Sequence, residues 1–212
     1  MSKIFIIGLP RTGTTSISVA LLDMGLSVAH TAFTKRAFEL ADAISDAPCF
    51  SDYRQLDQLF PSSKFIYLTR KMELWLPSIT MLLDKMAPHL APKTGKFSPV
   101  LKRSFHHTFS PTLPLSSDEL MVCYRRHEQG VQAYFKGRDD LLTIDVSEPG
   151  SLLKIKQFLG MPIAGDVDFP KLNAGRQVAA WKEYKHPNKI NSHQAGVEHK
   201  KYFDYVLADE HK

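Results

Sequence analysis

The loop at residues 8–16 carries the first side chains that could do chemistry. It follows an apolar segment at residues 3–7 and holds two glycines, Gly8 and Gly13, separated by four residues. A strand, a glycine-containing loop and a helix in this order are typical of a phosphate-binding loop, because backbone N–H groups and the positive end of the helix dipole converge there on one anion. The helical spacing of apolar residues that completes this order is found at Ile17, Ala20, Leu21 and Met24.

The cation of this loop stands in an unusual place. Loops that bind nucleoside triphosphates continue after the second glycine with a lysine, which reaches the β- and γ-phosphates. Here Thr14 follows Gly13, and the cation is Arg11, two residues earlier. We therefore predict an anion site whose contacts come from Arg11, Thr12, Gly13, Thr14, Thr15 and Ser16.

A second candidate anion contact follows the apolar segment at residues 64–69. Arg70 ends this predicted strand, and Ser78 comes eight residues later, on the predicted helix that follows. A guanidinium at a strand end and a hydroxyl about two turns into the next helix can hold one phosphate from two sides. The pair is common by itself and becomes specific only together with the N-terminal loop.

The elements that must position these residues alternate between strands and helices. Such alternation predicts a three-layer α/β/α domain of the phosphate-loop type, with a central, mostly parallel sheet. Right-handed crossovers bring the carboxyl ends of the strands to one edge, where ligands bind. The strand ends at that edge would carry the loop, His30, Asp52 and Arg70. The predicted strands are residues 3–7, 26–29, 49–52, 64–69 and 141–145, and the later predicted helices are residues 34–45, 53–60, 72–83, 116–136, 150–159 and 197–207.

We expect a single domain over residues 1–212, with an insertion at about residues 84–117. Prolines interrupt the helical pattern of this insertion, and basic side chains lie among them. Long irregular stretches inside a compact domain are often functional. The insertion could be a solvated loop or a lid that binds an acceptor, and the sequence favours neither.

Composition excludes several classes of protein. The net charge is +5, which suits a small polyanion or a nucleic acid, but the positive charge is spread along the chain and counts against nucleic acid. The two cysteines cannot form a disulfide framework. No apolar run approaches the length of a membrane span, and residues 1–9 are too short for the apolar core of a signal peptide. We expect a cytoplasmic protein with no membrane segment and no metal site.

Taken together, these residues resemble the sulfotransferases that use 3′-phosphoadenosine 5′-phosphosulfate (PAPS). In that family the first loop reads Lys/Arg-Ser/Thr-Gly-Thr-Thr/Ser and holds the 5′-phosphosulfate, and residues 11–15 match each position. The family's second motif is an arginine at a strand end with a serine eight residues on, both of which hold the 3′-phosphate. Arg70 and Ser78 match that spacing.

The resemblance is greatest to the small, soluble branch of the family and covers about residues 3–83 and 120–175. In that branch the second strand ends in His, and a later strand reaches an Asp-x-Pro. His30 and Asp52 correspond to these positions, although Arg54 stands where the branch has proline. A Phe-Leu-Gly at residues 158–160 and a Phe-Pro-x-x-Asn at residues 169–173 also match. Arg176 is the nearest, loose candidate for the family's C-terminal phosphate clamp.

The resemblance implies in-line transfer of a sulfuryl group from PAPS to a hydroxyl or amine, with 3′,5′-diphosphoadenosine (PAP) as the product. Arg11 and the loop would stabilise the developing charge, and no metal is expected. The base that takes the acceptor's proton would be Asp52, or else His30, which could instead orient it. On the residues alone, His30 could equally be a hydrogen-bonded strand-end histidine, and Asp52 a helix N-cap.

Two other interpretations stay open. The chain could be a nucleotide kinase or another NTPase with a degenerate loop, or an inactive module that binds PAP or PAPS. For an enzyme, we expect a small-molecule or glycan acceptor rather than nucleic acid. The sequence indicates neither the acceptor's identity nor the oligomeric state.

Overall fold

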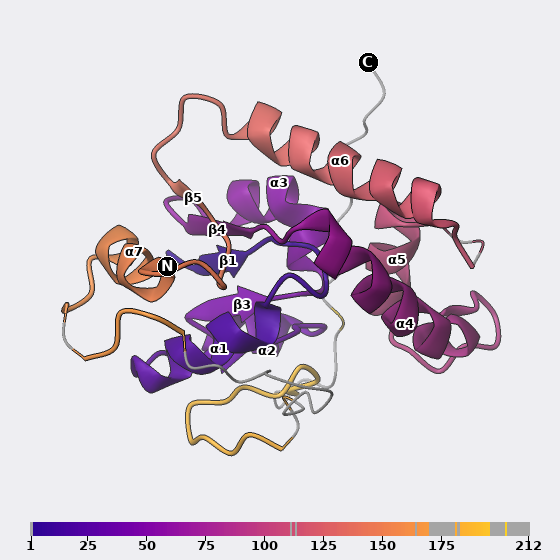
Figure 1. The fold of residues 1–212 in the computed structure, drawn as a ribbon. Coiled ribbons are helices and arrows are strands. Elements are labelled where there is room, and N and C mark those ends of the chain that lie inside the picture. Colours follow the sequence, from indigo (N-terminus) through magenta and orange to yellow (C-terminus); the bar gives the residue numbers. More distant parts are fainter. Residues whose placement is uncertain are drawn as a thin grey trace.

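The structure is a computed structural model that describes residues 2–110, 112, 114–163, 165–169, 181, 183–195 and 202. Within these residues, a five-stranded parallel sheet has the order β2-β3-β1-β4-β5 (Figure 1). This confirms the predicted α/β class. The strands are β1 (Ile4–Ile6), β2 (Val28–Ala29), β3 (Ala43–Ser45), β4 (Lys64–Leu68) and β5 (Leu141–Ile144). The helices are α1 (Thr14–Asp23), α2 (Lys35–Leu40), α3 (Cys49–Leu59), α4 (Met72–Leu90), α5 (Pro99–Thr108), α6 (Ser117–Tyr134) and α7 (Ser151–Leu159).

Strand β1 lies at the centre of the sheet, between β3 and β4. Phe5 pairs with Ile44 of β3 and with Phe65 of β4, and all three side chains are fully buried. Central parallel strands are apolar on both faces because helices cover both. The chain leaves β1 toward β2 and leaves β4 toward β5, so the carboxyl ends of β1 and β4 form the switch point at which ligands bind in such sheets.

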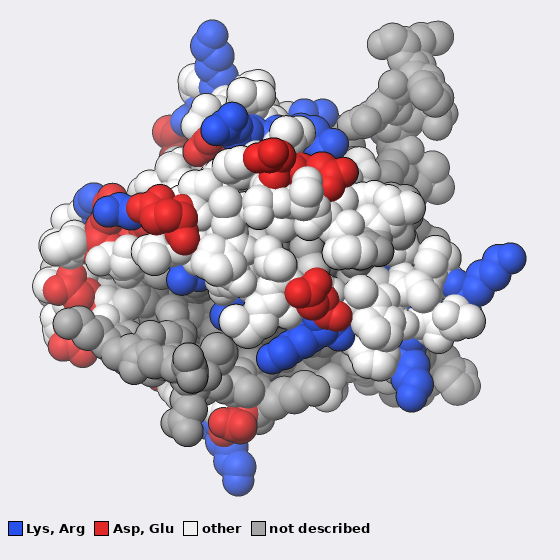
Figure 2. Space-filling model, turned by 45° about the vertical axis from the view of Figure 1, so that its right-hand side comes forward, with Lys and Arg blue, Asp and Glu red and all other residues white. Residues whose placement is uncertain are grey.

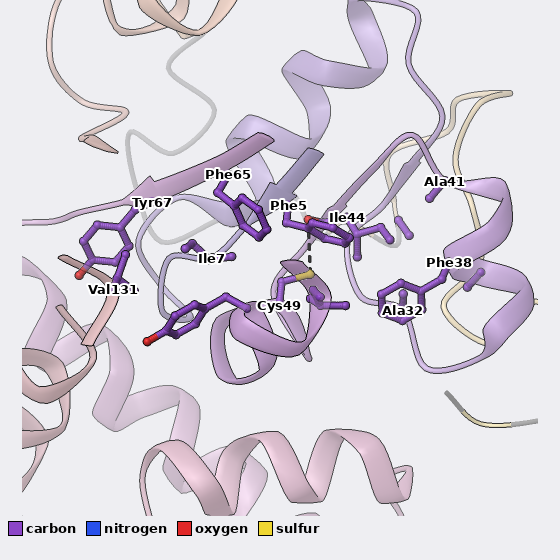
Figure 3. Close-up of a cluster of buried hydrophobic side chains, with 14 of the residues drawn as sticks. Phe5, Ile7, Ala32, Phe38, Ala41, Ile44, Cys49, Phe65, Tyr67 and Val131 are labelled. Carbon is purple, nitrogen blue, oxygen red and sulfur yellow. Dashed lines mark hydrogen bonds between the residues drawn. The ribbon is translucent and has the colours of Figure 1, made fainter. Parts of the chain in front are cut away.

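Two apolar clusters define the helical layers on the two faces of the sheet. On one face Cys49 of α3 and Val131 of α6 belong to the same cluster as Phe5 (Figure 3). On the other face Ile155 of α7 belongs to the cluster that contains Ile6, to which α1 also contributes. Alternate side chains of β1 therefore serve opposite layers, as a strand requires.

A third cluster joins α4, α5 and α6 to the carboxyl edge of the sheet. Trp75 of α4, Phe105 of α5 and Tyr124 of α6 belong to it, together with Leu9 from the loop after β1. Figure 1 shows α4 and α5 together at one end of the sheet and α6 running back from that end above α3. They thus place side chains beside the predicted phosphate loop.

The element prediction is wrong between residues 41 and 52. The predicted helix at 34–45 ends at Leu40, and Ala43–Ser45 is strand β3. Residues 49–52 begin α3 and do not form a strand. The apolar residues at 41–44 fit a helix face or a buried strand equally well. Pairing with β1 on one side and β2 on the other favours the strand.

The stretch at residues 84–117 is more regular than predicted. Helix α4 continues to Leu90, and α5 occupies Pro99–Thr108. The Ser98 hydroxyl accepts a hydrogen bond from the N–H of Leu101 at 3.3 Å, and Pro99 suits the first helical position. Proline therefore marks the start of a helix here as well as a break.

The other predicted elements lie close to their expected places. Ser116 caps α6 as predicted, and the Glu119 side chain completes a capping box. The predicted last helix at 197–207 lies outside the described residues, except for Tyr202. No described helix is both long enough and apolar enough to span a membrane.

Candidate active site

The backbone of the loop after β1 is fixed by three donors. The Thr12 hydroxyl donates to the carbonyl of Leu9 at 2.7 Å, and the Trp75 indole donates to the carbonyl of Pro10 at 2.9 Å. Arg70 Nη1 donates to the carbonyl of Arg11 at 2.7 Å. Three successive carbonyl oxygens of the loop are thus occupied by the protein itself, which holds the loop in one conformation.

The two glycines of the loop are required by their surroundings. A Cβ at Gly8 would lie 2.6 Å from Leu68 Cβ, and one at Gly13 would lie 2.5 Å from Val146 Cγ2. Gly13 also has a φ of +108°, which disfavours any other residue. The loop can therefore lie directly against the carboxyl ends of β4 and β5.

Helix α1 begins directly after this loop, with Gly13 as its N-cap. The N–H of Ile17 donates to the carbonyl of Gly13 at 3.1 Å, which makes Gly13 the first acceptor of the helix. The N–H groups of Thr14, Thr15 and Ser16 precede this bond and have no partner within the helix. Together with the helix dipole they present partial positive charge.

Two guanidinium groups and a hydroxyl meet beside this helix end. Arg11 Nε donates to Ser78 Oγ of α4 at 2.7 Å, and Arg70 reaches the backbone of Arg11. Burial and, second, the neighbouring Arg70 charge lower the pKa of Arg11, and Asp46 opposes them. Two like charges held this close favour an anion between or beside them. The structure thus brings together Arg11, Arg70 and Ser78.

His30 lies on the other flank of the loop, directly after β2. Its Nε2 is 2.8 Å from the Thr15 hydroxyl, and its Nδ1 is 3.9 Å from Asp46 Oδ2. Burial lowers the pKa of His30, while the Asp46 carboxylate raises it and the Lys189 ammonium lowers it. An imidazole of lowered pKa is neutral at neutral pH and can accept a proton.

Asp46 is the residue of this site that the sequence prediction missed. It follows β3, its Oδ2 accepts from the Thr14 hydroxyl at 3.4 Å, and its Oδ1 accepts from the Ala47 N–H at 2.8 Å. Burial raises the pKa of Asp46, and His30 lowers it. The signal that could have found it is present in the sequence, since residues 46–48 read Asp-Ala-Pro immediately after a strand.

Asp52 lies elsewhere than predicted. It is inside α3, only 3% exposed, and does not end a strand. Arg103 Nη2 of α5 pairs with its Oδ2 at 2.6 Å, and the Ser51 hydroxyl donates to its Oδ1 at 2.7 Å. The mismatch between Arg54 and the proline of the Asp-x-Pro pattern has the same cause. When the pattern begins at Asp46, Pro48 supplies its proline.

Some predicted residues lie outside the described part of the chain. Arg176 is one of them, and so are residues 170–173 of the Phe-Pro-x-x-Asn pattern. Phe169 is described and packs against the α1 and α7 cluster. Gly160 ends α7 with a φ of +69°. Among the described residues, no group of three or more His, Cys, Asp or Glu side chains is arranged to hold a metal ion.

On the face drawn in Figure 2, the charged side chains of the described residues form no dominant basic surface. Figure 2 shows Lys and Arg scattered over one face of the molecule, with Asp and Glu between them. The net charge of +5 is therefore not gathered into a stripe on this face. A compact anion site at the loop fits this distribution better than a polyanion surface.

The fold is that of an α/β protein in which a glycine-containing loop connects β1 to the N-terminus of α1 at the carboxyl edge of a parallel sheet. Residues 31–178 match the family model described as "Sulfotransferase domain". The chain therefore belongs to the sulfotransferase family, which confirms the resemblance stated from its motifs. The match begins after the loop at residues 8–16.

One solved structure to which the chain is similar is the mouse sulfotransferase SULT7A1 complexed with PAP. The two chains share 13% identity with a TM-score of 0.44, and the similarity covers 88% of this chain and 79% of the mouse chain. A comparison with curated proteins finds no match.

Proposed function

We propose that this protein is a sulfotransferase that moves a sulfuryl group from PAPS to a hydroxyl or amine of an acceptor. The observation that carries the proposal is that Arg11, in the loop leading to α1, contacts both Ser78 and Arg70, while His30 contacts Thr15 in the first turn of α1. Four parts of the chain supply these groups, namely the segments after β1, β2 and β4 and helix α4. Their chemistry suits a ligand with two separate anionic groups, as PAPS has.

The residues of the site divide between the two ends of such a ligand. The N–H groups at the start of α1, with Arg11, suit the phosphosulfate, whose transferred group develops negative charge during reaction. Arg70 and Ser78 suit the 3′-phosphate. The Thr12 hydroxyl donates to the Leu9 carbonyl and so shapes the loop from within, and its contact with the ligand stays a prediction.

We place the base at His30. Its neutral ring can direct Nδ1–H toward Asp46, which leaves the lone pair of Nε2 available to accept a proton. In the structure this nitrogen lies 2.8 Å from the Thr15 hydroxyl. As the acceptor oxygen bonds to sulfur, its proton moves to Nε2 and the bond from sulfur to the phosphate oxygen breaks. Asp46 takes the orienting role, and the ion-paired Asp52 has a structural one.

The test is transfer of labelled sulfuryl from PAPS across a panel of small hydroxyl and amine acceptors, including glycans. We expect turnover by the unmodified protein. His30→Gln should lower kcat by about 10²–10⁴-fold, the usual value of a general base. Its calorimetrically measured affinity for PAP should stay within a few-fold. Normal turnover by His30→Gln would exclude His30 as the base.

The other interpretations give different results in the same experiments. An inactive binding module would bind PAP but transfer nothing to any acceptor. An NTPase would prefer ATP with magnesium over PAP without it. Either outcome would overturn the proposed function.

A further inference from the structure

A segment beyond the family match completes the edge of the sheet. Residues 183–195 follow the last matched residue, 178, and run alongside β2. The N–H of Val28 donates to the carbonyl of Asn188 at 3.0 Å, and the N–H of Ile190 donates back to the carbonyl of Val28 at 2.9 Å. This parallel pairing covers β2, which is otherwise the outer strand.

Side chains also anchor this segment at several points. The Tyr184 hydroxyl donates to Asp23 Oδ1 of α1 at 2.6 Å, and the Asn188 amide donates to the carbonyl of Gly25 at 2.9 Å. Further along, the Thr34 hydroxyl donates to the carbonyl of Gln194 at 2.6 Å. The segment is thus tied to the elements that carry Thr15 and His30.

Two residues bring the segment to the site. The ring centroid of Trp181 lies 5.3 Å from that of His30. Lys189 Nζ donates to the carbonyls of Trp181 and Tyr184, and it lies 4.5 Å from the centre of the Trp181 ring. One ammonium therefore holds both the backbone and the ring of Trp181.

We propose that Trp181 and Lys189 are positioning residues of the active site, in which Trp181 packs against the ring of His30 and Lys189 fixes Trp181 there. The proposal rests on the proposed function, in which His30 takes the acceptor's proton. No motif in the sequence points to either residue. Both lie in the part of the chain that the family model does not match, so the arrangement of Trp181 and Lys189 around His30 involves residues outside the matched region.

The charges around His30 determine in which direction its pKa should change when Trp181 or Lys189 is replaced. Asp46 faces it from the end of β3, Lys189 faces it from the C-terminal segment, and α1 contributes the uncharged hydroxyl of Thr15. Arg11 acts on Asp46 from the loop. Burial and Lys189 both lower the pKa of His30. Loss of Trp181 or of Lys189 should therefore raise that pKa and keep the base protonated to a higher pH.

The experiment follows the imidazole signal of His30 by NMR during a pH titration of the full chain, with His30→Gln used for assignment. Trp181→Ala and Lys189→Met are compared with Lys185→Met, which removes the same charge from an exposed position of the same segment. We expect both test variants to titrate at higher pH than the unmodified protein, and the control to superimpose on it. The acid limb of the kcat/KM profile should move in the same direction. Trp181→Ala should also lose about tenfold in kcat, as expected when a reacting group loses its orientation.

The outcomes separate the two proposals. If no acceptor is sulfated but the titration shifts as expected, the proposed function fails and the contact with His30 stands. If the titrations of Trp181→Ala and Lys189→Met superimpose on that of Lys185→Met, the positioning role is wrong even for an active enzyme. Circular dichroism confirms that each variant is folded, and Lys189→Arg, which keeps the charge, should restore the titration of the unmodified protein.

Discussion

Asp46 and Asp52 have different environments, although they are only six residues apart. Asp46 lies against His30 and Thr14 at the phosphate loop, whereas Asp52 is held by Arg103 and Ser51 beneath α5. The motif Asp-x-Pro could be recognised in the sequence, but its position depends on where the strand before it ends. Because the residues of β3 fit the end of a helix in sequence, the strand end is predicted at Asp52, six residues after the end at which Asp46 lies.

Because of these environments, the same substitution should change the pH profile of activity at Asp46 and the stability of the fold at Asp52. Asp46→Asn removes the charge that raises the pKa of His30, so the acid limb of the kcat/KM profile should move to lower pH. Asp52→Asn should leave the profile in place but lower the free energy of unfolding by about 1–3 kcal/mol, because the Arg103 guanidinium loses the negative charge with which it pairs. The measurements are pH-dependent kinetics and urea unfolding of both variants. A shift of the pH profile in Asp52→Asn alone would reverse the assignment.

At the scale of elements, much of the architecture could be predicted. Residues 64–68 and 141–144 are apolar runs bounded by polar residues, and α6 carries its capping box in the sequence. Strand β2 lies within the strand predicted at residues 26–29, whereas the three-residue β3 is too short to show a period and is defined only by pairing within the sheet. Helix α5 is not evident from the sequence because a proline can break a helix or begin one, and Pro99 begins this helix.

The loop between β1 and α1 gives a prediction at this scale. Gly13→Ala places a Cβ against Val146 at a φ of +108°, so it should cost about 1–3 kcal/mol of stability and weaken PAP binding. Gly137→Ala is the matched control, since Gly137 has a φ of +77° and open space around the added Cβ. It should cost only about 1 kcal/mol for the backbone and leave PAP binding unchanged. Thermal unfolding and calorimetry measure both. Equal losses of stability and unchanged binding in the two variants would show that the loop tolerates the Cβ.

At the scale of the whole molecule, buried histidines couple the fold to pH. His127 of α6 has its Nε2 2.8 Å from the carbonyl of Phe50, and burial lowers its pKa to about 4. The same histidine has a pKa of about 6.5 when unfolded, so between these values the unfolded chain binds the additional proton. The contribution of neutral His127 to the free energy of unfolding should therefore be fully present above pH 6.5 and be lost as the pH falls toward 4.

The size of this effect can be measured by difference. From pH 7 to pH 5 the unmodified protein should lose about 2 kcal/mol more stability than His127→Gln, whose amide can still donate to Phe50. Urea unfolding at the two pH values gives both numbers. His30 contributes in the same direction, so some pH dependence should persist in the variant. Identical pH dependence in the two proteins would contradict a buried neutral His127.

The central claim is that Arg11, Arg70 and Ser78 form the anion site of a PAPS-dependent enzyme. Calorimetric titration with PAP in the absence of magnesium tests it most directly, with ATP and magnesium as the comparison ligand. Arg70→Met is the test variant, and Lys85→Met, an exposed lysine on the same helix as Ser78, is its charge-matched control. We expect magnesium-independent PAP binding that falls by at least about tenfold in Arg70→Met and is unchanged in Lys85→Met. Preference for ATP with magnesium, or equal PAP affinity in both variants, would contradict it.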